Sequence, residues 1–198
     1  MHRPMTAMRL SIISSAIILT LCMTGCRKNT DTPVPRPVAY PRIEVYPAIY
    51  DTVTVHDIML PVNKGAVIAI DTKNDSNAWI NVTYPRYHAT LRYTASRHSR
   101  GGVTEATDNR LTRMSLNAGG NTTEILELQN PAGIASTIFV TPGATVTPVQ
   151  ILSTDSTRFV ISGVLEINSQ SATREEIAPV VAAVKEDLLF TAKHISTR

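Results

Sequence analysis

Cysteine and aromatic residues are scarce in this chain of 198 residues. Its two cysteines, Cys22 and Cys26, both lie near the N-terminus. No disulfide can therefore join distant parts of the fold, and stability must come from an ordinary hydrophobic core. Aromatic residues make up 5% of the chain, too few for a platform on which single-stranded nucleic acid stacks. We predict no nucleic-acid partner.

An excess of charge of one sign is also lacking. The formal net charge of the whole chain is +3. Arg3 and Arg9 belong to an N-terminal segment that we expect to be removed, and without them 17 basic residues stand against 16 acidic ones. The remaining balance does not favour a polyanionic partner.

Catalytic and metal-binding motifs are lacking as well. The sequence contains no Gly-x-Ser-x-Gly, Ser-x-x-Lys, Walker or His-Glu-x-x-His motif. His88 and His98 flank the end of a predicted hairpin and could meet in space, but this is weak spacing for metal ligands. Asp155-Ser156-Thr157 is more typical of a turn than of a nucleophile beside an acid. We predict no catalytic residue, no cofactor and no metal.

The N-terminal segment gives the clearest positive signal. After two arginines, residues 10–21 form an apolar run whose helix would rise roughly 18 Å, well short of a hydrocarbon core about 30 Å thick. Met23-Thr24-Gly25-Cys26 follows and is similar to the lipobox of bacterial lipoproteins. We predict a signal peptide over residues 1–25, cleavage before Cys26, and membrane anchoring through acyl chains such as palmitate on Cys26. An uncleaved transmembrane helix and a plain secretory signal are the alternatives.

A proline-rich segment separates the anchor from the rest. Residues 26–41 contain four prolines and little apolar bulk, which is typical of an extended tether. A ligand for a proline-recognising partner is the alternative. We expect residues 42–198 to form a single domain.

Alternating apolar residues predict a domain rich in strands. We expect a well-buried strand at 66–70 after a turn at Asn63-Lys-Gly65, and turn structure over 71–77. A polar loop over 95–102 and a helix over 104–116 should follow. The other expected strands lie near 43–45, 53–55, 79–84, 87–94, 123–128, 134–140, 146–153 and 158–167.

The C-terminal segment predicts an amphipathic helix. Thr173 and Glu176 have the spacing of a capping box, and we expect Pro179 either in the first turn or at the true start of the helix. Lys185, Glu186 and Lys193 should face away from the apolar stripe, which either packs on a sheet or fills a partner's groove. The stripe consists of Ile177, Val180, Val181, Val184, Leu188, Leu189 and Ile195. Since βαβ alternation is lacking, we predict an α+β domain, mainly antiparallel, with this helix and one further helix.

Six arginines gather between residues 86 and 113, together with two histidines. Only Glu105 and Asp108 offset this charge within the segment. A solvated surface is the ordinary interpretation, and contact with lipid headgroups or an acidic partner is the functional one. The arginines are Arg86, Arg92, Arg97, Arg100, Arg110 and Arg113.

The order of segments resembles one known family. Tyr40-Pro-Arg-Ile43 precedes Ala78-Trp-Ile-Asn-Val-Thr-Tyr-Pro85, and the stretch from Pro148 to Leu165 contains the turn Thr154-Asp-Ser-Thr157. With the C-terminal helix, these segments resemble the GldD-type gliding-motility lipoproteins of the Bacteroidota over nearly the whole mature chain. The C-terminal part is also similar to Mog1/PsbP-like domains, which implies architecture and not function.

The resemblance implies a non-enzymatic envelope component that assembles or scaffolds the motility machinery or an associated secretion machinery. A lipid-anchored module for a glycan or small ligand is the alternative, with a pocket lined by Trp79, Tyr84 and Tyr93. An enzyme would require converging polar groups, for example His88 with Asp155. Surface-exported lipoproteins of the phylum that the resemblance implies tend to carry an acidic run just after the lipidated cysteine. No such run follows Cys26, so we predict a domain that faces the periplasm, and we expect the outer membrane as its location. The sequence specifies neither the partner nor the oligomeric state.

Overall fold

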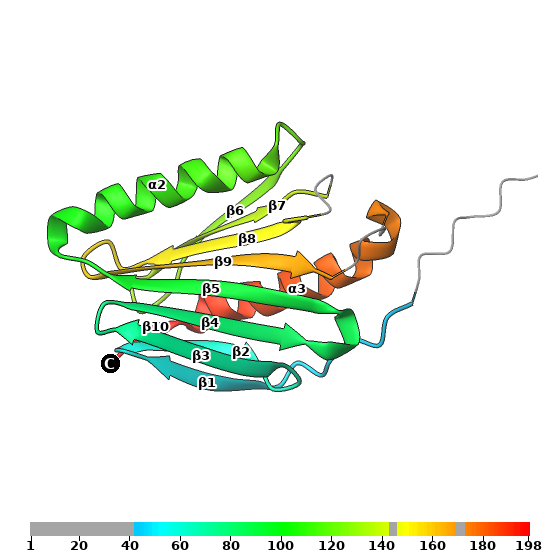
Figure 1. Cartoon of the computed structure of the whole chain (residues 1–198), viewed down its shortest axis with the longest axis horizontal. Helices are drawn as coiled ribbons and strands as arrows, with labels where there is room; N and C mark the ends of the chain where they lie inside the picture. The colour runs from blue at the N-terminus through cyan, green and yellow to red at the C-terminus, as the bar shows by residue number, and fades with distance from the viewer. Residues whose placement is uncertain (1–41, 143–145, 169–172) are drawn as a thin grey trace, which may run out of the picture. The chain divides into compact units, whose positions relative to one another are not determined.

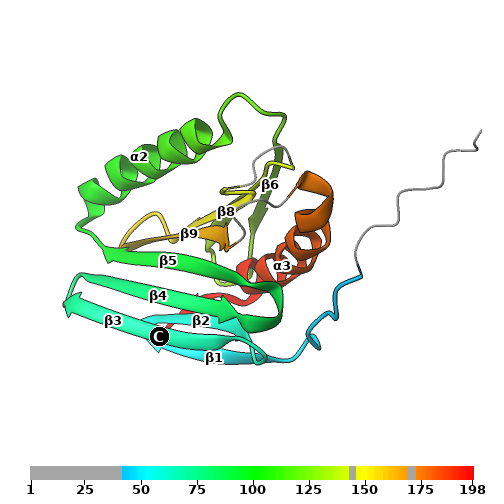
Figure 2. The same cartoon turned by 45° about the vertical axis from the view of Figure 1, so that its right-hand side comes forward.

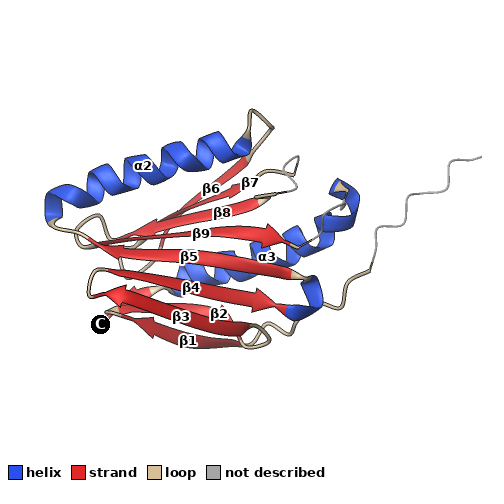
Figure 3. Cartoon of the chain, viewed as in Figure 1, coloured by secondary structure: helices blue, strands red, loops and turns tan. Residues whose placement is uncertain are grey.

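The structure, a computed structural model, describes residues 42–142, 146–168 and 173–198. Cys26 and the segments expected to form the signal peptide and tether lie outside these residues. The described chain forms antiparallel sheets with two long helices, which confirms the predicted α+β class (Figures 1 and 3). None of the described helices has both the length and the apolar character needed to cross a membrane.

Seven strands form the main antiparallel sheet, in the order β3-β4-β5-β9-β8-β7-β6. Strands β3 and β6 are therefore its two edges. The strands are β3 (Val67–Asn74), β4 (Asn77–Tyr84), β5 (Ala89–Arg97), β6 (Glu124–Gln129), β7 (Ala135–Val140), β8 (Val149–Thr154) and β9 (Phe159–Ile167).

A smaller sheet has the order β1-β2-β10 and lies beside the β3–β4 end of the main sheet (Figures 1 and 2). It consists of β1 (Tyr50–Val55), β2 (Ile58–Asn63) and β10 (Ser196–Thr197). The short 3₁₀ helix η1 (Pro85–Tyr87) separates β4 from β5. Because β10 pairs with β2, the C-terminus is fixed against a strand near the start of the domain.

The two long helices cover opposite faces of the main sheet (Figure 2). On β8, Ile151 belongs to the core cluster that includes α3 (Arg174–His194), while the adjacent Leu152 packs with residues of α2 (Arg100–Ala118). Successive residues of a strand point to opposite faces, so this alternation places one helix on each face. Helix α2 contacts β8 and β9, which leaves the β3–β4 part of its face uncovered by a helix.

Most predicted elements are confirmed. Strand β4 ends at Tyr84, directly before Pro85, and β5 pairs with it, as the hairpin prediction requires; β6 to β9 form the two later strand pairs. Helix α3 begins with the predicted capping box: Glu176 N–H donates to Thr173 Oγ1, and Thr173 N–H donates to a Glu176 carboxylate oxygen. Its apolar stripe is buried in the core, apart from Leu189, which is partly buried and packs against it.

The predicted burial of residues 66–70 is wrong. Strand β3 extends to Asn74 and forms an edge of the sheet, and the side chains of Val67 and Ile70 are 60% and 45% exposed. A short apolar run looks the same on a central strand and an edge strand. The order of strands, which decides its burial, is set by distant pairings.

Strand β2 is not among the expected strands, and its sequence contains Pro61, which has no N–H to donate within a sheet. The structure shows how the proline is tolerated: the Pro61 carbonyl accepts a hydrogen bond from Thr191 Oγ1 of α3. In an antiparallel strand, the N–H and C=O of one residue point to the same side. The nitrogen of Pro61 therefore points toward α3, as its carbonyl does, and the absence of an N–H removes no hydrogen bond between β2 and β1. Residues 43–45, expected as a strand, have no regular secondary structure.

The limits of both helices differ from expectation. Strand β5 runs to Arg97 and α2 begins at Arg100, so most of the expected loop over 95–102 is regular structure. The glycine pair at its start has low helix propensity, but Val103 is 2% exposed and packs with Phe139, Leu152 and Val160. Burial of this first turn outweighs propensity.

Within α3, Pro179 is the sixth residue and not part of the first turn. Its ring removes one hydrogen bond to the carbonyl of Glu175, an exposed residue that water can reach. Lys185 does not face away from the fold as expected. Its Nζ lies 2.8 Å from both carboxylate oxygens of Glu124 on β6.

The end of α3 is held by one buried side chain. Asn130 lies in the turn between β6 and β7 and is 7% exposed. Its Nδ2 donates to the carbonyls of Ala192 and Ile195, at 3.2 and 2.7 Å. Its Oδ1 accepts from the N–H groups of Ala132 and Ile134. One amide thus satisfies backbone groups of both the turn and the helix end.

Candidate functional site

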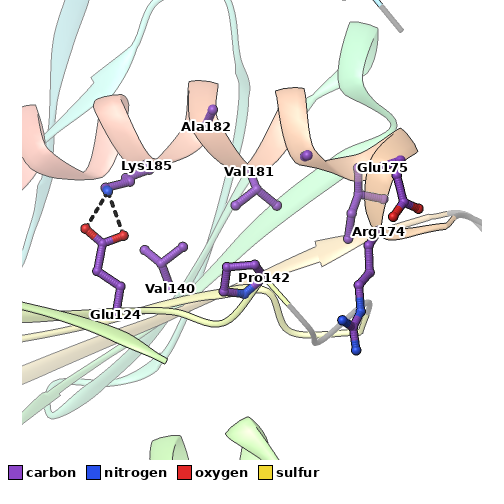
Figure 4. A pocket seen from close by; sticks show the side chains of 10 residues that line it. Glu124, Val140, Pro142, Arg174, Glu175, Val181, Ala182 and Lys185 are labelled. Carbon is purple, nitrogen blue, oxygen red and sulfur yellow. Dashed lines mark hydrogen bonds and ion pairs between the residues drawn. The ribbon is translucent and has the colours of Figure 1, made fainter. Parts of the chain in front are cut away.

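A groove lies between the first half of α3 and the β6–β7 edge of the sheet (Figure 4). Its volume of about 350 Å³ falls in the range of small-ligand pockets, roughly 300–1,000 Å³. The lining residues are Glu124, Val140, Pro142, Arg174, Glu175, Ile177, Ala178, Val181, Ala182 and Lys185.

The chemistry of this groove is simple. Lys185 and Glu124 face each other across one end and form an ion pair (Figure 4), while Arg174 and Glu175 come from the start of α3. Between them the wall is aliphatic. No histidine, serine or cysteine is among the described residues that line the groove. The groove is suited to an apolar segment. The ionisable side chains that line it are Glu124, Arg174, Glu175 and Lys185, of which Lys185 and Glu124 are held in an ion pair.

The two histidines considered as metal ligands lie far apart. His88 precedes β5 and His98 follows it, and ten residues of extended strand span roughly 30 Å. His98 Nε2 instead lies 2.8 Å from Ser96 Oγ. The expectation that these histidines could meet is therefore wrong. Within the described ranges, no group of three or more potential metal ligands is present.

The arginines of this segment whose side chains the structure describes do not form one patch. Arg86 precedes β5 and Arg97 ends it, and each pairs with an acid from elsewhere: Arg86 with Glu44 at 2.9 Å, and Arg97 with Asp57 at 3.7 Å. Arg92 pairs with Glu166 at 2.6 Å in the same way. Sequence proximity overstated the local charge, because the balancing acids come from distant segments. Arg110 and Arg113 of α2 are treated below.

The three aromatic residues proposed for a ligand pocket do not converge. Tyr84 and Tyr93 are 1% and 3% exposed and belong to the main core. Trp79 is 36% exposed, and its odd spacing from Tyr84 on β4 places it on the opposite face of the sheet. The aromatic pocket is therefore not formed by these residues.

Asp155 forms the turn that the sequence predicted, just before β9 and at the end of the sheet where His98 N–H donates to the Arg158 carbonyl. Its Oδ1 accepts hydrogen bonds from the N–H groups of Thr157, Arg158 and Phe159. Desolvation acts to raise the pKa of this carboxyl. The hydrogen bonds from these backbone groups and from the Arg158 side chain outweigh it and lower the pKa from 3.8 to about 2. Proximity of His88 to Asp155 is excluded, because the two lie at opposite ends of β5 and β9.

Substitution of Asp155 by asparagine should remove a pH-dependent part of the stability. The folded-state pKa is lowered, so the carboxylate contributes stability that is fully present above about pH 4 and is lost as the pH falls through about 2. We expect Asp155→Asn to lower the free energy of unfolding by about 1–2 kcal/mol at pH 7 and by almost nothing near pH 2. Urea unfolding across this pH range measures the difference. Asp75→Asn, in the exposed turn after β3, is the control, and an equal pH dependence in both variants would contradict the assignment.

A buried carboxylate on α3 was missed by sequence analysis. Asp187 is 9% exposed, and its Oδ1 accepts from Tyr50 O–H at 2.8 Å and from Asn63 Nδ2 at 3.1 Å. Burial and this carboxylate raise the pKa of Tyr50. The signal was present, because Asp187 lies three residues after Val184 on the apolar stripe. The contacts join α3 to β1 and β2, which indicates a structural role.

Comparisons with known proteins give one match. A scan against protein-family models matches residues 30–193 to the family described as gliding motility lipoprotein GldD. No curated protein and no solved structure matches the chain. The matched range begins after Cys26 and includes β1 to β9 and α3 as far as Lys193.

Proposed function

This chain belongs to the GldD family of gliding motility lipoproteins, and from that membership we propose that it is a lipid-anchored, non-enzymatic assembly or scaffolding component of the motility machinery or of secretion machinery associated with it. The family match over most of the chain carries the proposal. Cys26 would bear the lipid and residues 26–41 would form the tether. The domain over 42–198 would then face the periplasm from the outer membrane.

An assembly component needs an accessible contact surface, and the β3 edge supports this role. The outer side of β3 has no strand partner among the described residues. Val67 and Ile70 on this strand are exposed. The negatively charged Asp71 follows directly after Ile70. The apolar first half of β3, residues 67–70, precedes this charge, and an apolar edge segment can pair with an extended segment of another protein. We propose such a segment of a machinery subunit as the partner of the β3 edge.

Affinity capture tests the proposed function. We expect a C-terminally tagged wild type, extracted from membranes, to co-purify with subunits of the motility or secretion machinery in mass spectrometry. The Cys26→Ala form should be released from the membrane and lose these partners, because acyl chains supply the anchor. Protease added to intact cells should leave the tagged domain whole. A wild type that stays in the membrane without any envelope partner would instead favour a ligand-binding module.

Two further tagged variants localise the contact. Ile70→Lys places a charge on the β3 edge, and Ile125→Lys is the matched control on the opposite edge strand, where Ile125 is 53% exposed. We expect only Ile70→Lys to lose the co-purifying subunits. Equal retention by both variants would exclude the β3 edge as the contact without affecting the proposed function.

A further inference from the structure

A small cavity lies beneath α2, on the face of the sheet opposite α3. It has a volume of about 200 Å³, smaller than a typical drug-sized pocket. We call it the α2 pocket. It is lined by Arg110, Arg113, Met114 and Asn117 of α2, Gln150 of β8, and Ser162, Gly163 and Val164 of β9. The four helix residues share the spacing i, i+3, i+4, i+7, so they form a single stripe along the side of α2 that borders the pocket, with Met114 buried and Arg113 exposed.

The polar groups of the α2 pocket are held in place by hydrogen bonds. Gln150 is 1% exposed; its Oε1 accepts from Asn117 Nδ2 at 2.9 Å, and its Nε2 donates to the Met114 carbonyl at 3.1 Å. A guanidinium N–H of Arg110 donates to Ser162 Oγ at 3.0 Å. Arg110 is thus fixed over a polar floor rather than extended into solvent.

The charge of the α2 pocket is not balanced. Neither Arg110 nor Arg113 forms an ion pair with a described residue, and no carboxylate lines the pocket. Asp108 and Glu105 lie roughly 140–160° around the helix from Arg110. Glu166, on the same face of β9, is engaged by Arg92.

The closeness of two like charges has an energetic consequence. Burial, and then the positive charge of Arg113, lower the pKa of Arg110. Both effects disfavour the charged form, and a bound anion would offset both. Guanidinium groups also match the geometry of phosphate oxygens, with charge-assisted hydrogen bonds roughly twice as strong as neutral ones.

We propose that the α2 pocket binds a phosphate group, held by the guanidinium groups of Arg110 and Arg113. Asn117 and Ser162 are the neighbouring polar side chains, and the volume suits a single small group. The same chemistry fits free inorganic phosphate and the phosphomonoester of a lipid headgroup. The site is independent of the β3 edge and of the machinery proposed above.

Calorimetric titration of the full-length chain in detergent micelles tests the site. One arm uses inorganic phosphate, and the other uses short-chain phosphatidic acid carried in the same micelles. We expect saturable binding in at least one arm, and at least a tenfold weaker affinity for Arg113→Gln, since hydrogen bonds to charged groups contribute about 1.5–3 kcal/mol. Binding in the phosphatidic acid arm alone would identify a lipid headgroup as the source.

Matched variants make the result decisive. Arg113 is exposed and makes no ion pair, so its substitution should leave the fold unchanged in circular dichroism. Arg174→Gln removes the same charge from an arginine on the opposite side of the sheet and should bind as the wild type does. Absence of saturable binding in both arms, or an equal loss for Arg174→Gln and Arg113→Gln, would overturn the proposal. Arg110→Gln should weaken binding as strongly as Arg113→Gln.

Discussion

Replacement of Asn130 by alanine should lower the free energy of unfolding by about 3 kcal/mol. The substitution removes four hydrogen bonds at once. It leaves the carbonyls of Ala192 and Ile195 and the N–H of Ile134 without their partner, and these three residues are at most 1% exposed. A buried polar group without a partner costs more than a typical hydrogen bond contributes. Urea unfolding at neutral pH, followed by circular dichroism, measures the loss.

The preceding residue provides the control for Asn130. Gln129 is exposed, and its side chain makes one long hydrogen bond of 3.5 Å, to the Gly133 carbonyl. Gln129→Ala should change the free energy of unfolding by less than about 0.5 kcal/mol. Similar losses for the two variants would mean that the turn itself, and not the link to α3, sets the stability.

Elements with a strong local pattern could be predicted from the sequence. Helix α3 has a capping box at Thr173 and an apolar stripe over five turns, and both signals depend only on residues close in the chain. The β4–β5 hairpin was predicted because Pro85 ends one alternating run and another begins shortly after it. The antiparallel character then followed from the absence of βαβ alternation.

Features set by distant segments could not be predicted. The exposure of β3 depends on its place at the edge of the sheet, and the ion pairs of Arg86 and Arg97 depend on Glu44 and Asp57. Strand β2 was missed because the tolerance of Pro61 rests on a contact with α3, 130 residues later. In each case the local residues are compatible with several environments.

The residues of the α2 pocket and the buried carboxylate of α3 could be predicted only in part from the sequence. Arg110 and Arg113 were recognised as part of a basic segment, but their separation from the other arginines requires the packing of α2 on β8 and β9. Gln150 gave no signal, because a single glutamine in an apolar strand does not reveal its partners. Asp187 did give one, as an acid on an apolar helix face.

Substitution of Gly163 by alanine should also destabilise the fold, by about 1–3 kcal/mol. Gly163 lies on β9 against the ring of Tyr93 on β5. An added Cβ would lie 2.6 Å from Cε1 of Tyr93 and 2.9 Å from Cγ2 of Ile151. Both neighbours are at most 3% exposed, so neither side chain can move into solvent. Overpacking in such a core typically costs about 1–3 kcal/mol, occasionally more.

The same substitution at Gly101 should have the opposite sign. Gly101 is in the first turn of α2, and an added Cβ there would meet nothing within 4 Å. Alanine should therefore stabilise the protein, by up to about 0.5–1 kcal/mol, through helix propensity.

A double variant tests whether the Tyr93 ring causes the loss at Gly163. If it does, Tyr93→Leu should reduce the cost of Gly163→Ala, so that the double variant is less destabilised than the sum of the two single variants. Additive losses in urea unfolding would show that the strain lies in the β9 backbone and not in the contact with Tyr93.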